Sequence, residues 1–164
     1  MPTYNIYTDG ACSQNGTWNG GWAYVITLAE QIVSEKSGGE QQTTNNKMEL
    51  EAVKHSLCEI VSFLSFCGES RLDTVVNIYS DSAYFVNCIK DKWYINWEKN
   101  GWKTSKKEPV KNPDTWAAIL YYVRYIEENC KEFNVIKVKA HTTDKWNNYV
   151  DRKAVEAKDE VGKL

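Results

Sequence analysis

The chain is organised around one short run of residues near its start, Tyr7-Thr8-Asp9-Gly10-Ala11-Cys12. The run ends an alternating pattern over residues 3–9, which predicts a strand with Tyr7 and Asp9 on the same side. A carboxylate in a core strand is costly unless it is paired or binds a metal. Asp-Gly is also a common turn dipeptide, so the run by itself favours a plain turn into a glycine-rich loop over residues 10–21. Three acids later in the chain shift the interpretation of Asp9 from a turn residue towards a metal ligand.

The composition is that of one globular domain. Among 164 residues, 42% are hydrophobic and 26% are charged, so we expect residues 1–164 to form one domain with a sizeable core. There is no apolar run of about 18 residues to span a membrane, and the N-terminus lacks a secretory pattern. The five cysteines form no CxxC pair, which argues against disulfides or zinc. We therefore expect a cytoplasmic protein.

The order of elements predicts an α/β fold. The first three strands should pair antiparallel and the later, helix-connected strands parallel, giving a mixed five-stranded sheet with helices on both faces. Strands are expected over residues 3–9, 22–28, 31–37 (followed by a turn at Gly38-Gly39), 75–81 and 133–140, and helices after Thr43-Thr44-Asn45-Asn46, over 83–90, from Pro113, and over 147–158.

Three later acids resemble Asp9 in their setting. Glu49 shares a helix face with Val53 and Leu57. Asp81 ends a strand that runs into a helix, where open α/β sheets place their sites. Asp151 has apolar residues at i+3 and i+4. Helix dipole and N-cap effects offer plainer interpretations of Glu49 and Asp81. Glu51 and Glu59 fall off the apolar stripe and are expected to be solvated.

Four inward carboxylates would have a definite chemistry. Hard oxygen ligands without cysteine or paired histidine select Mg²⁺ or Mn²⁺. Two such ions would relieve the repulsion and stabilise the attacking and leaving oxygens of a phosphoryl displacement. His141, in a polar loop ten residues before Asp151, could move a proton or help product leave, although a lone loop histidine is usually just solvated.

Charge is distributed unevenly along the chain. Residues 90–111 carry seven lysines and three acids, a net +4, while the rest of the chain is −6. Trp93, Trp97 and Trp102 interleave with these lysines, a pattern that suits phosphates and bases of a nucleic acid. The i, i+4 spacing of Trp93 and Trp97 also fits one of them packing in the core.

Taken together, these motifs resemble type 1 ribonuclease H, of the cellular kind with a basic protrusion. They cover nearly the whole chain in the family's order, and the ordered set is highly specific. The matching stretches are Tyr7-Thr8-Asp9-Gly10, Thr43-Thr44-Asn45-Asn46-Lys47-Met48-Glu49-Leu50, Tyr79-Ser80-Asp81-Ser82, Trp97-Glu98-Lys99-Asn100-Gly101-Trp102-Lys103-Thr104, Val110-Lys111-Asn112, and Val138-Lys139-Ala140-His141 with Asn147 and Asp151.

The resemblance implies a ribonuclease H-like fold and a monomer that cleaves the RNA strand of RNA–DNA hybrids, leaving 3′-hydroxyl and 5′-phosphate ends. It implies that Asp9, Glu49, Asp81 and Asp151 hold two Mg²⁺ ions, with Mn²⁺ as a substitute, and that His141 assists turnover. It also implies substrate contacts by Gly10, Cys12, Asn15, Thr44, Asn45, Asn46, Asn87 and Asn147, and by Trp93, Trp97, Trp102 and Lys103 of the protrusion.

Several positions depart from the family pattern. The 15–21 loop has an insertion and no proline, Thr27 stands where an arginine is frequent, and Ala83 replaces a frequent glutamine; Ala140 and Thr143 replace glycines beside His141. We expect weaker hybrid binding than usual, with the chemistry kept. The alternatives are a catalytically weak or inactive hybrid-binding module, another polynucleotide enzyme such as a DNA nuclease or integrase-like transferase, and a purely structural α/β domain.

Overall fold

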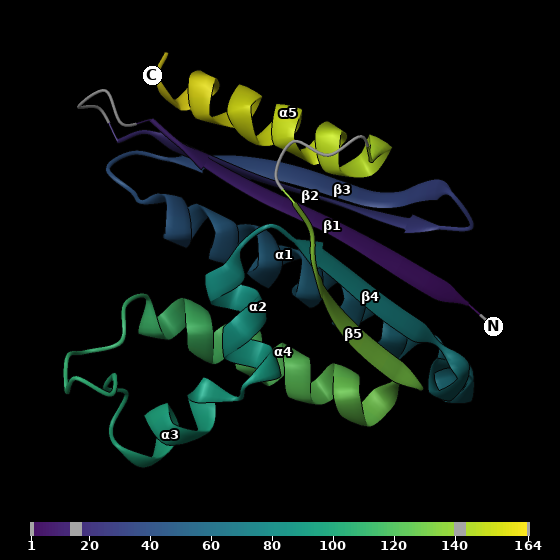
Figure 1. Ribbon diagram of the computed structural model, residues 1–164. Helices are drawn as coiled ribbons and strands as arrows, with labels where there is room; N and C mark the ends of the chain where they lie inside the picture. The colour runs from purple at the N-terminus through teal and green to yellow at the C-terminus, as the bar shows by residue number, and fades with distance from the viewer. Residues whose placement is uncertain (1, 14–17, 140–143, 164) are drawn as a thin grey trace.

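The computed structural model describes residues 2–13, 18–139 and 144–163. They form five strands, five α-helices and one short 3₁₀ helix (Figure 1). In chain order the elements are β1 (Thr3–Cys12), β2 (Gly20–Leu28), β3 (Gln31–Glu40), α1 (Asn45–Phe66), η1 (Gly68–Asp73), β4 (Val75–Ser80), α2 (Ala83–Lys90), α3 (Trp93–Lys99), α4 (Pro113–Asn129), β5 (Glu132–Lys137) and α5 (Lys145–Val161).

The strands form one mixed sheet in the order β3-β2-β1-β4-β5. β1 and β2 pair antiparallel, as do β2 and β3, whereas β4 pairs parallel with both β1 and β5. The parallel pairs require helical crossovers, which α1 and the α2–α4 segment supply. The predicted mixed five-stranded sheet is confirmed.

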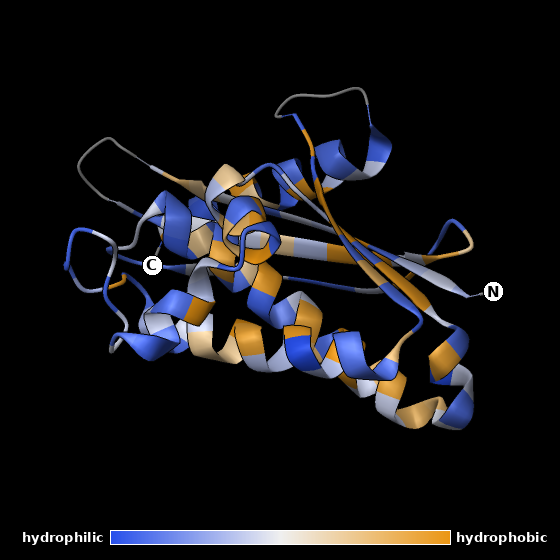
Figure 2. Cartoon of the chain, turned by 60° about the horizontal axis from the view of Figure 1, so that its bottom comes forward, coloured by the Kyte–Doolittle hydropathy of each residue, from blue (hydrophilic) through white to orange (hydrophobic). Residues whose placement is uncertain are grey.

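Helices cover both faces of the sheet (Figure 1). On one face, α1 packs against the sheet and α4 packs against α1; together they enclose the larger core, which includes Ile6, Ile26 and Ile78. On the other face, α5 packs Trp146 and neighbouring residues against β1 and β2 in a smaller core. Figure 2 shows orange residues gathered along the central strands, while the helices alternate between orange and blue, as amphipathic helices on a sheet should.

Two predicted turns are instead parts of strands, and packing explains both. β1 continues through Asp9 and Gly10, which pair with Ala23 and Trp22 of β2. A Cβ on Gly10 would lie 2.4 Å from the backbone nitrogen of Glu49, so glycine is needed here for the close approach of α1. β3 likewise runs through Gly38, over which the Trp22 ring lies, rather than turning at Gly38-Gly39.

Other boundaries differ at the ends of elements. β5 covers Glu132–Lys137 instead of 133–140, and β4 ends at Ser80. α5 begins at Lys145, earlier than residue 147, because the Asp144 carboxylate accepts hydrogen bonds from the backbone of Trp146 and Asn147 at 2.9 and 3.0 Å. α3 lies inside the basic segment and was not predicted, since seven residues carry too little periodicity to identify a helix.

No helix within the described residues is both long and apolar enough to cross a membrane.

Candidate active site

Three acids from distant parts of the chain meet at one end of the sheet. Asp9 lies on β1 and is 8% exposed, and Glu49 lies in the first turns of α1 and is 5% exposed. Asp81 follows β4 directly, at the carboxyl end of a strand parallel to β1. One carboxylate oxygen from each lies within 4.8 Å of the other two. The sheet register and the start of α1 therefore bring three of the four predicted acids together.

Local sequence fixes where Glu49 lies. Thr44 caps α1, its hydroxyl accepting a hydrogen bond from the backbone nitrogen of Lys47 at 3.1 Å. Gly10 lets the next turn of the helix rest directly on β1. The Glu49 side chain therefore lies on the side of α1 that faces Asp9.

The fourth acid approaches from the other face of the sheet. Asp151, on α5, is exposed and lines the same pocket of about 190 Å³. The α5 cap at Asp144 and the packing of Trp146 on Tyr7, with ring centroids 6.4 Å apart, hold this helix in place. The pocket is lined by Thr8, Asp9, Gly10, Asn45, Glu49, Asp81, Val138, Lys139, Asn147, Asn148 and Asp151.

The carboxylates raise one another's affinity for protons. Burial, with the negative charges of Asp81 and Asp151, raises the pKa of Asp9 from 3.8 to about 8, although the backbone N–H of Gly10 partly opposes this. Burial and the charges of Asp9 and Asp81 raise the pKa of Glu49 well above its usual value. Without a cation, the cluster is therefore unfavourable in its ionised form.

The donor set fits a divalent cation. Two buried oxygens, Glu49 Oε2 and Asp81 Oδ1, accept no hydrogen bond from the part of the chain that the structure describes. Buried acceptors without partners are rare and need an explanation. A cation held by oxygen ligands would satisfy these atoms and relieve the repulsion.

The other predicted residues divide into groups. Gly10, Asn45 and Asn147 line the pocket. Thr44 and Cys12 are not among its lining residues, and the Cys12 thiol contacts the backbone oxygen of Thr43 at 3.5 Å. Asn46 and Asn87 are exposed and lie outside the pocket lining, and Asn15 and His141 fall outside the described residues.

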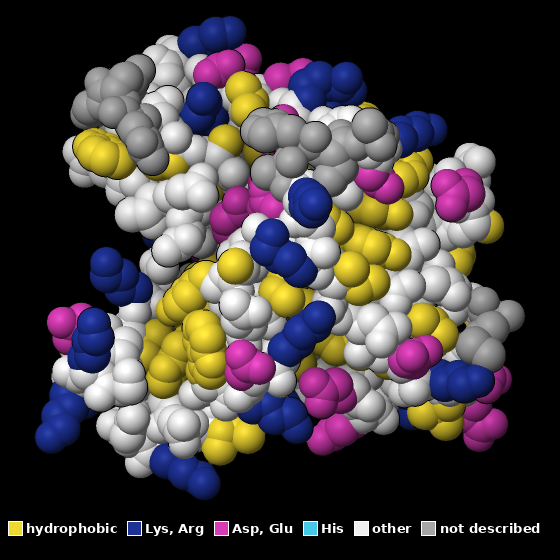
Figure 3. All heavy atoms as spheres, viewed as in Figure 1, with side chains coloured by type: hydrophobic (Ala, Val, Ile, Leu, Met, Phe, Trp, Pro, Cys, Tyr) yellow, Lys and Arg dark blue, Asp and Glu magenta, His cyan; other side chains and the backbone are white. Residues whose placement is uncertain are grey.

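We call residues 91–111 the protrusion; it comprises α3 and the loop that follows (Figure 1). Figure 3 shows Lys and Arg side chains projecting from it beside a hydrophobic patch, with carboxylates in a hollow nearby. A second pocket of about 620 Å³ is lined partly by Trp93, Trp97 and Lys103. Trp93 is 36% exposed, whereas Trp97 is 6% exposed and packs on Trp116, so one of the pair lies in the core. Trp102 is half-buried beside Trp97.

The structure shows where two of the residues that depart from the family pattern lie relative to the pocket. Thr27 is 1% exposed and pairs with Asn5, whereas Asp9 pairs with Ala23, so Thr27 lies away from the acids and its difference does not bear on the pocket. Ala83 is exposed at the start of α2, close to Asp81. The expected weakening of hybrid binding stays a prediction.

Sequence reasoning missed several residues. Asn148 and Lys139 line the pocket, and the position of Asn148, three residues before Asp151, could have indicated this. Glu51, expected to be solvated, is only 9% exposed, so that prediction was wrong. α4 covers its side of α1, and nothing in the α1 sequence alone reports that contact.

Comparison with known proteins agrees with this geometry. A model of the RNase H family matches residues 1–159. The chain belongs to the RNase H family. A ribonuclease H of Syntrophomonas wolfei subsp. wolfei is 41% identical over 157 residues, which cover 96% of this chain and 97% of that relative. RNase H is a nuclease, and the protein is an enzyme of this class.

Solved structures of the family share the fold. LC9-RNase H1, described as a type 1 RNase H with the type 2 active-site motif, superposes with a TM-score of 0.74 at 24% identity, covering 98% of this chain and 74% of that one. LC11-RNase H1 in complex with an RNA/DNA hybrid has a TM-score of 0.65 at 21% identity, covering 96% and 98%. At these identities the likeness concerns the fold alone.

Proposed function

We propose that this protein hydrolyses the RNA strand of RNA–DNA hybrids by two-metal catalysis, leaving 3′-hydroxyl and 5′-phosphate ends. The observation that carries the proposal is the cluster of Asp9, Glu49 and Asp81 at the carboxyl end of β4, in which Asp9 and Glu49 are buried and Asp81 is half-buried. Family membership and the LC11-RNase H1 complex with an RNA/DNA hybrid support the choice of substrate.

Four residues would hold the metal ions. Asp9, Glu49 and Asp81 offer the clustered oxygens, and Asp151 adds a carboxylate from α5. When bound, Mg²⁺ would stabilise negative charge on the attacking and leaving oxygens of an in-line displacement, and Mn²⁺ would be a substitute. The raised pKa of Asp9 indicates that its ionised form depends on such a cation.

The chain's polar residues would orient the substrate. Asn45 and Asn147 present amides to the pocket from opposite faces of the sheet, where they can hydrogen-bond to sugars and base edges. Thr44, at the start of α1, would seat a phosphate near the positive end of the helix dipole. His141 would assist product release.

The protrusion would hold the DNA strand. Lys103 and Trp93 are exposed beside its pocket and offer a cation and a ring. Trp97 would act mainly by supporting this surface from the core. We propose further that residues 1–164 act as a single domain, as a monomer, in the cytoplasm.

The test is cleavage of three duplexes in parallel: hybrid, DNA–DNA and RNA–RNA, each labelled on one strand. The proposal predicts cleavage of the hybrid's RNA strand only, with 5′-phosphate ends on the downstream fragments. Cleavage of duplex DNA would instead indicate a DNA nuclease or transferase. Tight binding of the hybrid without cleavage would indicate the inactive binding module.

A further inference from the structure

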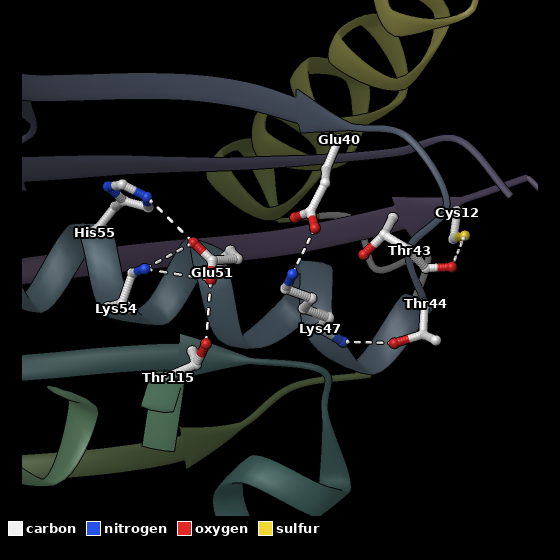
Figure 4. Close-up of polar contacts among 9 residues, drawn as sticks. All are labelled: Cys12, Glu40, Thr43, Thr44, Lys47, Glu51, Lys54, His55 and Thr115. Atoms are coloured by element: carbon white, nitrogen blue, oxygen red, sulfur yellow. Dashed lines mark hydrogen bonds and ion pairs between the residues drawn. The ribbon is translucent and has the colours of Figure 1, made fainter. Parts of the chain in front are cut away.

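Glu51 lies two residues after Glu49 on α1, in a polar cluster outside the catalytic pocket (Figure 4). The Thr115 hydroxyl, at the start of α4, donates to Glu51 Oε1 at 3.2 Å, and both residues are 9% exposed. On α1 itself, Lys54 Nζ lies 3.0 Å and His55 Nε2 lies 3.3 Å from Glu51 Oε2. One carboxylate therefore joins the catalytic helix to α4.

The same cluster reaches the sheet. The His55 ring stacks on Trp22 of β2, with centroids 4.2 Å apart and planes 4° apart. Trp22 in turn covers Gly38 of β3, where a Cβ would come within 2.6 Å of the indole. The Glu51–His55 pair therefore fixes α1 relative to β2 and β3 as well as to α4.

On the other side, Thr115 leads into the base of the protrusion. The next residue, Trp116, is fully buried. Its ring makes an edge-on contact with the Trp97 ring, with the ring centroids 5.5 Å apart. The ring centroids of Trp97 and Trp102 lie 6.1 Å apart. Further along α4, Arg124 forms paired hydrogen bonds to Glu98 of α3 at 2.6 and 2.8 Å. α4 is therefore the support on which the protrusion rests.

We propose that Glu51 is a positioning residue that couples the catalytic helix to the protrusion, and so sets how a hybrid lies across both at once. This inference rests on the proposed function, because it assigns the substrate to both surfaces. Glu49 and Glu51 then have separate tasks on one helix. Glu49 faces the metal site, and Glu51 holds that helix at a fixed spacing from α4.

The energetics suit this role. A buried carboxylate costs desolvation energy, and its partners must offset this cost for the charge to remain. Lys54 Nζ, His55 Nε2 and the Thr115 hydroxyl, all within 3.3 Å of the Glu51 carboxylate oxygens, are these partners. The hydrogen bond from Thr115 is the contact of Glu51 that crosses to α4, and its directionality adds to the apolar packing between the two helices.

The test compares hybrids of increasing length. In the wild type, affinity should rise with the length of the duplex until the duplex reaches the protrusion. A hybrid below that length is called the short hybrid, and one above it the long hybrid. Thr115→Val removes the donor at nearly constant shape, and Glu51→Gln keeps the acceptor but removes the charge. Both variants should lose roughly threefold to tenfold in affinity for the long hybrid, and little for the short one.

Dissociation constants are measured in EDTA, so that the test needs no cleavage, and KM and kcat are then measured in Mg²⁺. Coupling predicts a raised KM for the long hybrid with kcat nearly unchanged, and recovery in Thr115→Ser. Glu59→Gln, on the same helix, is the matched control and should behave as the wild type. Equal losses for both lengths, or an unchanged long-to-short ratio, would overturn the coupling.

These outcomes separate the two claims. Wild-type protein that shows the affinity step but never cleaves would refute the proposed hydrolysis and leave the coupling testable. Wild-type protein that cleaves the hybrid, with variants that keep the normal length dependence, would refute only the role of Glu51. Thermal denaturation of each variant shows whether a loss reflects unfolding, which would lower affinity for both lengths alike.

Discussion

Replacing Asp9 with asparagine should stabilise the metal-free protein, although it should abolish activity. Burial and the charges of Asp81 and Asp151 raise the Asp9 pKa from 3.8 to about 8. The folded protein therefore resists ionisation that the unfolded chain undergoes freely. Asparagine has the same shape and can still accept the hydrogen bond that the Gly10 backbone donates at 2.9 Å. It removes the charge and keeps the packing.

The pKa shift sets the size and sign of the effect. Between 3.8 and pH 7 lie about three pH units at 1.36 kcal/mol each, an upper bound of about 4 kcal/mol. Because neighbouring carboxylates share the repulsion, we expect about half, roughly 2 kcal/mol, or a rise in Tm of about 4 to 8 °C. Below pH 3.8 the Asp9 carboxyl is protonated in both states, so this gain should vanish; it should grow up to pH 8.

The assay is thermal denaturation followed by circular dichroism in EDTA, at pH values from about 4 to 8. Asp73→Asn, at an exposed position in η1, is the control and should leave Tm unchanged. Added Mg²⁺ should raise the Tm of the wild type more than that of Asp9→Asn, because it binds the folded site. A Tm gain that is independent of pH, or a loss of stability at pH 7, would refute the electrostatic account.

Four further substitutions test other parts of the structure. Trp97→Ala should destabilise the fold by about 3 to 5 kcal/mol in urea denaturation, whereas Trp93→Ala should keep stability and weaken hybrid binding; equal stability losses would contradict their different burial. Gly10→Ala should place its Cβ against the Glu49 backbone and reduce cleavage about a hundredfold in a rate assay, and near-normal cleavage would show that α1 need not approach β1 so closely. The stability advantage of the wild type over Glu51→Gln should shrink as pH falls from 4.5 towards 2, because the lowered pKa contributes stability only above that range; a constant difference in Tm would argue against it.

The residues that identify the site could be predicted because each one breaks a local pattern. Asp9 continues a strand that should be apolar, Glu49 shares a face with Val53, and Asp81 ends a strand before a helix. These conflicts between charge and pattern are visible without coordinates. The parallel pairing of β1 with β4 brings Asp9 and Asp81 together, and the close approach of α1 to β1 adds Glu49.

What could not be predicted depends on contacts between distant segments. Gly10 looked like a turn because its close neighbour, Glu49 on α1, is far along the chain. Glu51 looked solvated because Thr115, 64 residues away, is what covers it. Trp93 and Trp97 share the same spacing pattern, and only the packing of Trp116 decides which of them is buried. Local periodicity carries no information about such tertiary partners.

The most direct test of the central claim is cleavage of an RNA–DNA hybrid labelled on its RNA strand. It is run with wild-type protein in Mg²⁺, with wild-type protein in EDTA, and with Asp9→Asn in Mg²⁺. The account predicts cleavage in the first reaction alone. Cleavage that persists in EDTA or in Asp9→Asn would contradict it, because the acids at the end of the sheet would then not be the site of a metal-dependent reaction.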